Sequence, residues 1–167
     1  MDLKILITAI YVLVVGLVCF FAGLIVPRSI FDENKFPYKS FKWEDGGKIY
    51  DKLHIKSWKA KLPEMSKITK LIFPKKLKKN MTADDFDRLV KESCIAELSH
   101  YVLCVCSLGI YYIWRGKLGA FLALIYGVLG NVTYIIIQRY NRPHFIAVRD
   151  KLKVREERRL NAGLSGF

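Results

Sequence analysis

The chain has 167 residues, 52% of them hydrophobic, and its 28 Lys and Arg against 15 Asp and Glu give a net charge of +13. A soluble domain spreads its apolar residues periodically, whereas here they form long blocks, which excludes an ordinary soluble globular protein. Anionic lipid headgroups attract basic residues that flank such blocks, and no nucleic-acid-binding motif is visible. We therefore predict membrane lipid as a partner, and no nucleic acid.

Three apolar blocks reach the roughly 20 residues that a helix needs to cross the hydrocarbon core. Ile5–Val26 is free of charge, exceeds the length of a signal-peptide core and lacks a cleavage site of small residues, so we predict a retained anchor. The block Cys94–Trp114 contains one acidic residue, Glu97, and one histidine, His100. The block Leu118–Ile137 contains no charged residue.

The first two blocks are separated by a long basic segment. Glu44–Gly47 predicts a turn, and the alternating apolar residues Leu53, Ile55 and Trp58 predict a strand or an irregular stretch. In Met65–Phe73 apolar residues recur at helical spacing between lysines. This pattern favours a basic amphipathic stretch in the membrane surface, with a solvated loop as the alternative.

A helix start precedes the second block. Thr82 can cap, with Asp85 three residues on in the manner of a capping box, so we expect one helix from Ala83 into the second span. The very short turn Trp114–Gly119 then forces the second and third spans into an antiparallel hairpin. Small residues let membrane helices approach closely, and we expect a small-residue face of the third span to pack on the second; its members are Gly119, Ala123, Gly127 and Gly130.

Lys and Arg near span ends stay cytoplasmic, and they concentrate in the central segment and the tail. The sequence therefore predicts an all-α integral membrane protein with about three transmembrane helices and a basic cytoplasmic segment between the first and second. Its N-terminus is expected outside the cell membrane, with the central segment and C-terminus cytoplasmic. The predicted parts are an anchor helix (1–26), a basic cytoplasmic or interfacial segment (27–81), a hairpin of two transmembrane helices (82–138) and a basic cytoplasmic tail (139–167).

Polar residues within the apolar blocks are the candidate site, because ionisable groups near hydrocarbon are costly and usually functional. Glu97 and His100 share a helix face, and the antiparallel hairpin brings Asn131 to their level. A carboxylate beside a histidine suits a general base, and Asn131 and Arg139 could donate to a developing oxyanion. The alternative is that the Glu-x-x-His pair binds a neighbouring Arg and fixes helix packing.

The run after the third block is rich in donors. Arg139, Asn141 and Arg142 could bind phosphate or carboxylate, or they could be a stop-transfer cluster that snorkels to headgroups. Carboxylate-bridged metal bundles use the Glu-x-x-His spacing twice, and it occurs once here, so we predict no metal.

Several stretches resemble the glycosyl-4,4'-diaponeurosporenoate acyltransferase family, from about Phe41 to Arg149. The most specific is Gln138–Pro143, followed by the Glu-x-x-His motif. The departures are Tyr101 where the family has Trp, and His144 where Arg is expected; Pro63–Lys79 has little to match. The matching stretches are Lys39–Phe41, Trp43-Glu44, Gly47-Lys48, Ile55–Lys59, Ala96–Tyr101, Asn131 and Gln138–Pro143.

The resemblance implies a membrane-bound O-acyltransferase that moves a fatty acyl group from an activated thioester to a sugar hydroxyl of a glycosylated carotenoid or similar glycolipid. His100 would be the general base and Glu97 its orienting partner. The thioester, an acyl-CoA or acyl carrier protein, would be a co-substrate, with no cofactor. The expected substrate-binding residues are Asn131, Arg139, Asn141 and Arg142, with Lys56, Trp58 and Lys59 at the cytoplasmic rim.

Two functions of other classes remain open on the sequence. One is a non-enzymatic membrane adaptor whose basic loop holds anionic lipid or a partner. The other is a small integral-membrane methyltransferase, for which no adenosine-binding pattern is recognisable.

Overall fold

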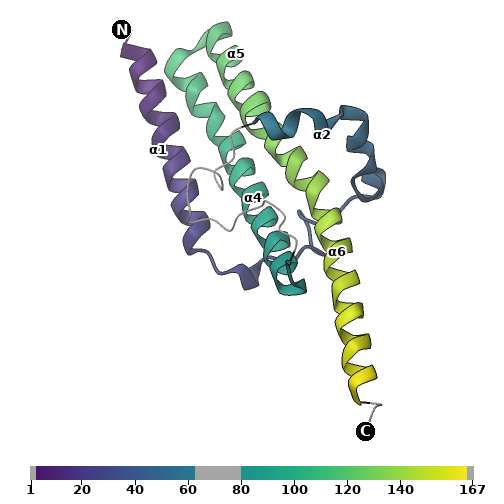
Figure 1. Ribbon diagram of the computed structural model, residues 1–167. Helices are drawn as coiled ribbons and strands as arrows, with labels where there is room; N and C mark the ends of the chain where they lie inside the picture. The colour runs from purple at the N-terminus through teal and green to yellow at the C-terminus, as the bar shows by residue number, and fades with distance from the viewer. Residues whose placement is uncertain (1–2, 63–79, 165–167) are drawn as a thin grey trace. The chain divides into compact units, whose positions relative to one another are not determined.

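The structure, a computed structural model, describes residues 3–62 and 80–164 (Figure 1). These residues form helices and connecting turns with no strand among them, which confirms the predicted all-α class. Three of the helices are long and apolar enough to cross a membrane, as expected. The predicted amphipathic stretch Met65–Phe73 lies outside the described residues.

The chain divides into two compact units. The apolar unit comprises residues 1–31 and 94–138, and the polar unit comprises residues 32–93 and 139–167. Two of the three boundaries, 93/94 and 138/139, fall inside long helices, so helix α4 (Ala83–Trp114) and helix α6 (Thr133–Leu164) contribute to each unit. The four-part division predicted from the sequence follows membrane topology and stays a prediction.

In the apolar unit, helix α1 (Leu3–Ile25) has no buried residue, and its large apolar side chains are exposed along its whole length. A helix that is apolar on every side suits hydrocarbon and not water. Hydrogen bonds connect it to α4: the Tyr11 hydroxyl donates to the Cys106 carbonyl at 2.7 Å, and the Trp114 indole N–H donates to the Thr8 hydroxyl at 2.8 Å. The short helix η1 (Arg28–Ile30) follows α1.

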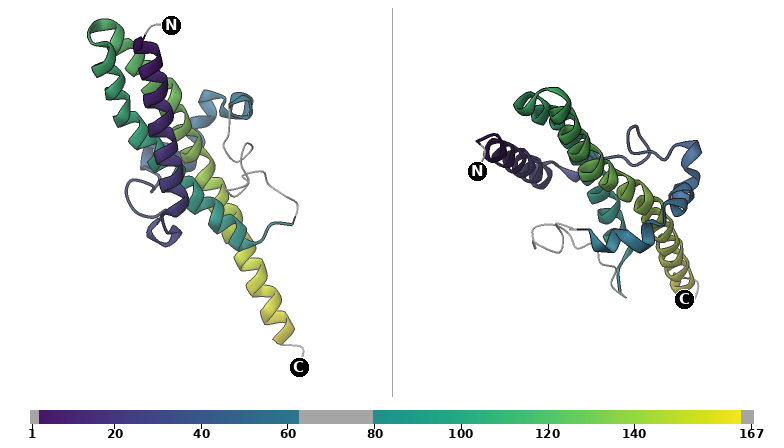
Figure 2. Two further views of the ribbon diagram at one scale, coloured as in Figure 1. Left: turned by 90° about the vertical axis from the view of Figure 1, so that its left-hand side faces the viewer. Right: turned by 90° about the horizontal axis from the view of Figure 1, so that it is seen from above.

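The predicted hairpin is present. Helix α4 ends at Trp114, and after Arg115 the chain enters helix α5 (Gly116–Gly127), which runs back beside α4 in Figures 1 and 2. Arg115 and Gly116 both have positive φ, of 52° and 61°, which reverses the chain within two residues.

The small-residue face of α5 packs as expected at three of its four positions. Gly119, Ala123 and Gly127 are buried. A Cβ on Gly119 would lie 3.1 Å from the Tyr111 carbonyl oxygen, and one on Gly127 would lie 3.1 Å from the Ser107 hydroxyl, so both glycines permit the close approach of α4. A Cβ on Gly130 would meet only Tyr126 of its own helix, at 3.6 Å.

Gly130 differs because the helix changes its pitch there. Between α5 and α6 the chain passes through η4 (Val128–Val132), a π-helical turn. Such turns are rare in proteins, and those that occur often lie at functional sites. The face predicted from a constant helical period therefore ends at Gly127.

In the polar unit, α4 begins as predicted. The Thr82 hydroxyl accepts from the Asp85 N–H at 3.2 Å, and the Asp85 carboxylate accepts from the Thr82 N–H at 2.9 Å. The first turns of α4 pack on α6 through an apolar cluster whose buried members are Phe86, Leu89, Val90 and Phe145.

A charged network lies in the same unit. One Glu33 oxygen accepts from Arg149 at 2.6 Å and the other from Lys91 at 2.9 Å, and Arg149 also contacts Asp87 at 2.9 Å. Burial alone would raise the pKa of Glu33, but the hydrogen bonds from Arg149 and Lys91 outweigh it and lower this pKa to about 2.

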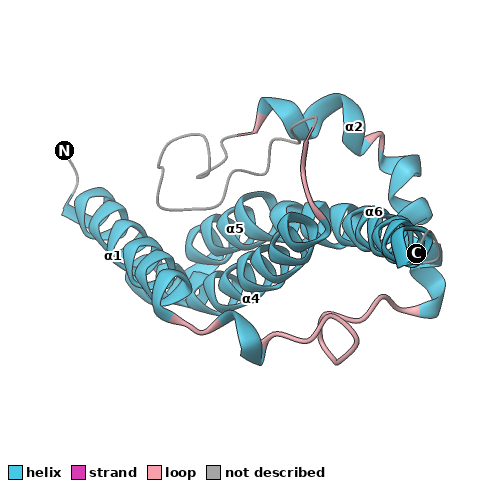
Figure 3. Cartoon of the chain, turned by 60° about the horizontal axis from the view of Figure 1, so that its bottom comes forward, coloured by secondary structure: helices cyan, strands magenta, loops and turns pink. Residues whose placement is uncertain are grey.

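The strand considered for the segment around Leu53, Ile55 and Trp58 is wrong. The segment forms short helical turns instead: η2 (Lys42–Leu53), α2 (Ile55–Trp58) and η3 (Lys59–Lys61), drawn as helix in Figure 3. Ile55 is buried and Leu53 is half exposed. His54 has φ 51°, which separates η2 from α2. A one-turn helix is too short to show a helical period, so its apolar spacing imitates strand alternation.

The predicted turn at Glu44–Gly47 is confirmed, since Asp45, Gly46 and Gly47 have positive φ inside η2. Gly47 is buried against α6: a Cβ there would lie 3.3 Å from the Tyr140 carbonyl oxygen. Its φ is 91°, so both the close approach of Tyr140 and the backbone conformation favour glycine at this position.

Candidate active site

His100 of α4 and Asn131 of η4 are hydrogen-bonded within the apolar unit. The distance between His100 Nδ1 and Asn131 Oδ1 is 3.0 Å. Asn131 is 2% exposed, whereas His100 is partly exposed. The structure thus brings together two of the polar residues that the sequence placed at one level of the hairpin.

A second hydrogen bond defines which atoms face each other. The Asn131 amide nitrogen donates to the Tyr126 carbonyl at 2.9 Å, so the amide oxygen is the atom that faces His100. Because an amide oxygen only accepts, His100 Nδ1 carries the hydrogen of this bond. In the neutral ring the lone pair then lies on Nε2, the atom that accepts a proton in base catalysis.

The imidazole plane is also held by stacking. The Tyr134 ring lies parallel to it, with 4.8 Å between ring centroids and 7° between planes. Tyr134 follows Asn131 by three residues, so the two side chains lie on one side of the helix. One short stretch of chain therefore defines both the tautomer and the orientation of His100.

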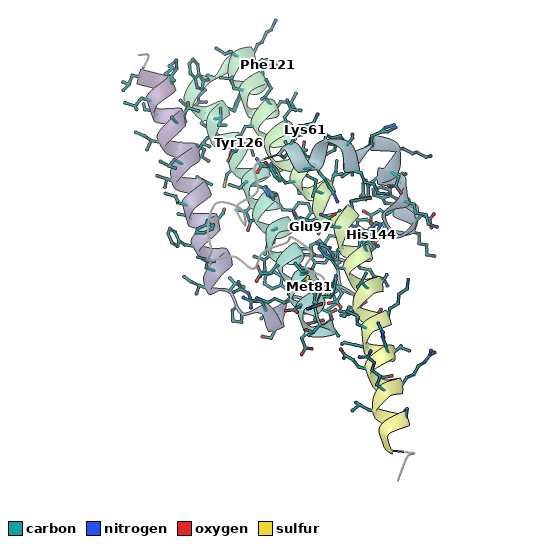
Figure 4. All side chains as sticks on the ribbon, viewed as in Figure 1. Lys61, Met81, Glu97, Phe121, Tyr126 and His144 are labelled. Carbon is teal, nitrogen blue, oxygen red and sulfur yellow. The ribbon has the colours of Figure 1, made fainter. Side chains whose placement is uncertain are left out.

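Glu97 is fully buried one turn before His100, and Figure 4 labels it on α4. The Tyr101 hydroxyl donates to its Oε1 at 2.8 Å. Tyr101 follows Glu97 by four residues, a spacing at which helix side chains meet. The Tyr101 hydroxyl therefore compensates part of the cost of burying this carboxyl group.

In the polar unit, Arg139 forms an ion pair with Glu44. Arg139 Nε and Nη2 donate to the two carboxylate oxygens at 2.5 and 2.7 Å, and the guanidinium also donates to the Pro37 and Lys39 carbonyls at 2.8 and 3.1 Å. Arg139 is 6% exposed and Glu44 is 1% exposed. A bidentate arrangement of this kind is the strongest form of the Arg–carboxylate contact.

Glu44 is saturated with donors. Its oxygens also accept from the Tyr50 hydroxyl and, at 2.6 Å, from the Phe41 N–H. Burial raises the pKa of Glu44, but the hydrogen bonds from Arg139, Tyr50 and Phe41 outweigh it, and the net direction is downward. Burial and the neighbouring Glu44 carboxylate raise the pKa of Tyr50 well above its usual value, so Tyr50 remains a donor.

Arg142 is likewise engaged by its own unit. Its Nε donates to the Ser93 hydroxyl at 2.8 Å, its Nη2 to the Ser93 carbonyl at 3.2 Å, and its Nη1 to the Tyr38 carbonyl at 2.7 Å. Its guanidinium carbon also lies 5.6 Å from the centre of the Tyr38 ring. Both arginines of the Gln138–Pro143 run therefore hold the preceding segment against α6.

The remaining candidates gather around Tyr140. Lys59 Nζ donates to Asn141 Oδ1 at 2.8 Å and lies 4.8 Å from the Tyr140 ring centre. Lys56 Nζ lies 3.5 Å from an Asp51 oxygen, which accepts from the Tyr140 hydroxyl at 3.4 Å. Separately, the indole N–H of the partly exposed Trp58 donates to the Leu53 carbonyl at 2.8 Å.

The predicted site residues thus fall into two sets, one in each unit. Glu97, His100 and Asn131 belong to the apolar unit, and the polar unit contains the others: Lys56, Trp58, Lys59, Arg139, Asn141 and Arg142. Among the described residues, no group of three His, Cys, Asp or Glu side chains could hold a metal ion.

Sequence reasoning missed three contributors to these arrangements. Tyr101 and Tyr134 could have been found by helical spacing, since they lie four residues from Glu97 and three from Asn131. Glu44 carried a weaker signal, as one carboxylate in a basic segment. Its partner Arg139 lies 95 residues further along the chain, and no local pattern could have paired them.

Comparison with known proteins bears on the chemistry. Residues 27–151 match the family model described as glycosyl-4,4'-diaponeurosporenoate acyltransferase. The chain belongs to this family. Acyltransferases of that name from Staphylococcus aureus strains bovine RF122 / ET3-1 and MRSA252 are each 28% identical to it over 138 residues, which cover 81% of this chain and 82% of the relative. No solved structure matches the chain.

Membership confirms the resemblance seen in the sequence and makes the protein an acyltransferase. The matched region contains every candidate site residue named above. With three helices suited to crossing a bilayer, the chain is a membrane acyltransferase.

Proposed function

We propose that this acyltransferase moves a fatty acyl group from an activated thioester to a sugar hydroxyl of a glycosylated carotenoid or a similar glycolipid. The names of its relatives support the acceptor class, since they are called glycosyl-4,4'-diaponeurosporenoate acyltransferases. The observation that carries the chemistry is the His100–Asn131 hydrogen bond, which leaves the lone pair of the neutral imidazole on Nε2.

In the proposed reaction, His100 Nε2 accepts the hydroxyl proton as the sugar oxygen attacks the thioester carbonyl carbon. The new C–O bond forms, the C–S bond breaks, and the carrier leaves as a thiolate that takes up the proton from His100. General-base assistance of this kind contributes about 10²–10⁴-fold in rate. No covalent acyl-enzyme is required.

Asn131 is proposed to orient the base. Its amide nitrogen donates to Tyr126 and its oxygen accepts from His100, so we assign it to holding the tautomer in place of the oxyanion role expected from the sequence. Glu97, which the sequence suggested as the orienting partner, is proposed to support the same helix face through its contact with Tyr101. A neutral amide orients the ring without the cost of a second charge near hydrocarbon.

The protein is proposed to lie in the cell membrane with its N-terminus outside and its central segment and C-terminus cytoplasmic. The support is the concentration of Lys and Arg in residues 27–91 and after Arg139. A donor carried by coenzyme A or an acyl carrier protein is anionic and would meet this basic side. The family is one of acyltransferases, which favours this function over an adaptor or a methyltransferase.

The test is acyl transfer by the full-length His100→Gln variant in membranes that contain the glycosylated carotenoid and an acyl thioester. We expect a loss of about 10³-fold, within the range for a lost general base. His54→Asn is the matched control, because His54 is exposed with φ 51°, a conformation that Asn tolerates. Wild-type activity in a correctly inserted His100→Gln variant would eliminate the mechanism.

A further inference from the structure

The cluster around Tyr140 in the polar unit differs from the arginine contacts beside it. Arg139 and Arg142 are nearly buried and donate to carboxylate, hydroxyl and carbonyl groups of their own unit. The donors around Tyr140 are more exposed: the Lys56 side chain is 74% exposed, and Asn141 is partly exposed.

Several hydrogen-bond donors share one patch of α6. Residues 140 and 141 are both neighbours of residue 144 on the helix surface, since they lie four and three positions before it. The exposed His144 ring contacts the Tyr140 ring, with 5.0 Å between centroids, and its Nδ1 donates to the Tyr140 carbonyl at 2.8 Å (Figure 4 labels His144). Because that carbonyl only accepts, the neutral ring has its second nitrogen, Nε2, directed away from the helix backbone.

The lysines supply the charge of this patch. Lys59 lies over the Tyr140 ring and reaches Asn141, and it orients the Asn141 amide so that the NH₂ group faces away from Lys59. Lys56 reaches the hydroxyl end of Tyr140 through Asp51. Lys56, Lys59 and the Asn141 amide thus offer two ammonium groups and one amide as donors around Tyr140, and the Asp51 carboxylate lies among them.

We infer that these donors form a binding site for a phosphate ester, held by Lys56 and Lys59 with Asn141, beside Lys59, as the neutral donor. The inference rests on the proposed function for the source of the phosphate, which is the carrier of the acyl thioester; an anionic lipid headgroup carries the same chemistry. Asp51 competes with the ligand for Lys56 and thereby limits the affinity.

The test measures binding by the full chain in nanodiscs of uncharged lipid, with coenzyme A as the probe and pantetheine, which lacks the phosphates, as its matched control. Lys59→Ala should weaken coenzyme A binding about tenfold, the equivalent of one charge-assisted hydrogen bond of about 1.4 kcal/mol. Pantetheine binding should not change. Asp51→Asn should tighten coenzyme A binding several-fold, whereas a purely structural Lys56–Asp51 pair would give no gain.

Lys153→Ala provides the charge-matched control. Lys153 is exposed and nine residues beyond His144 on α6, about 14 Å along the axis and beyond the screening length at physiological salt. If Lys59→Ala and Lys153→Ala lost coenzyme A affinity equally, the effect would be one of net charge alone. That result would contradict the proposed site.

A second arm separates the two sources of phosphate. Binding of the same variants to vesicles of phosphatidylglycerol or phosphatidylcholine reports on lipid headgroups. If Lys59→Ala lost vesicle binding but kept its affinity for coenzyme A, the phosphate would not come from the acyl donor. The site would then belong to a lipid headgroup. His100→Gln should bind coenzyme A like the wild type, so failure of the catalytic proposal and failure of this one give different results.

Discussion

The two units contain polar pairs of different kinds. In the apolar unit, the contact between His100 and Asn131 is a hydrogen bond of an imidazole with a neutral amide. In the polar unit, Glu44 and Arg139 are both ionised, and each charge meets several donors or acceptors. Charge near hydrocarbon is costly, whereas a bidentate ion pair with all its hydrogen bonds made is tolerated inside a polar unit.

This difference between the two pairs helps to separate polar residues with a structural role from candidates for a catalytic role. Arg139 and Arg142 looked like ligand-binding groups in the sequence, yet their donors hold the segment that contains Tyr38 and Glu44. The hydrogen bond to Asn131 defines the tautomer of His100, and the Tyr134 ring stacks on its imidazole. The hydrogen bonds of Arg139 and Arg142 suit a structural role, and a defined tautomer is what the proposed role of His100 as general base requires.

The largest effect is expected from a substitution that breaks the Arg139–Glu44 ion pair of the polar unit. Arg139→Met leaves Glu44 buried without its partner, which should destabilise the protein by about 3–5 kcal/mol. Arg139→Met combined with Glu44→Leu should recover much of this loss, because replacing both charges removes the unpaired one. Thermal unfolding in detergent measures the change, and Arg155→Met, at an exposed position of α6, is the control. Equal unfolding temperatures for Arg139→Met and the control Arg155→Met would contradict the structural role of the Arg139–Glu44 pair.

The second effect sharpens the role of the amide in the apolar unit. Asn131→Leu removes the acceptor of His100 Nδ1, and we expect acyl transfer to fall about 10–100-fold without loss of insertion. Asn131→Asp keeps an acceptor for His100 Nδ1 and should therefore retain more activity than Asn131→Leu. The control is Ser99→Ala, since the Ser99 hydroxyl donates to the Ile95 carbonyl of its own helix at 3.0 Å. Equal losses of activity in Asn131→Leu and Asn131→Asp would argue against the proposed orienting role of Asn131.

The third effect concerns the pH dependence of the polar unit. Because the pKa of Glu33 is lowered from 4.5 to about 2, its stabilising contribution is complete above about pH 4.5 and is lost as the pH falls toward 2. Glu33→Gln should therefore be less stable than the wild type at about pH 6, and the difference should vanish near pH 2. Unfolding by denaturant at several pH values measures it. A difference that stayed constant across this range would show that the ionised carboxylate is not what Arg149 and Lys91 stabilise.

The smallest effect tests the helix contact that supports the site. Gly127→Ala places a methyl group 3.1 Å from the Ser107 hydroxyl and should cost about 1 kcal/mol through overpacking. Gly130→Ala meets only Tyr126 at 3.6 Å and should be neutral or slightly stabilising. The matched pair is compared by thermal unfolding, and a reversed order would contradict the close approach of α4 and α5.

Sequence reasoning predicted the helices better than the site. The spans, the capping box at Thr82 and the hairpin at Arg115 depend on local pattern, and all appear in the structure. The one-turn helix at Ile55–Trp58 was missed because a single turn shows no period. The π-helical turn at Val128–Val132 was missed as well, since no composition signal distinguishes it from an α-helical turn.

Composition and hydropathy by themselves determined that this is a helical membrane protein, because burial in hydrocarbon requires long runs of apolar residues with internal backbone hydrogen bonds. The motifs also determined its acyltransferase family. Only the tertiary structure decided the partners of its polar residues: Asn131 with His100, and Glu44 with Arg139. Such pairs join residues 31 and 95 positions apart, and the strength of a hydrogen bond depends on distances and angles that the folded chain alone sets.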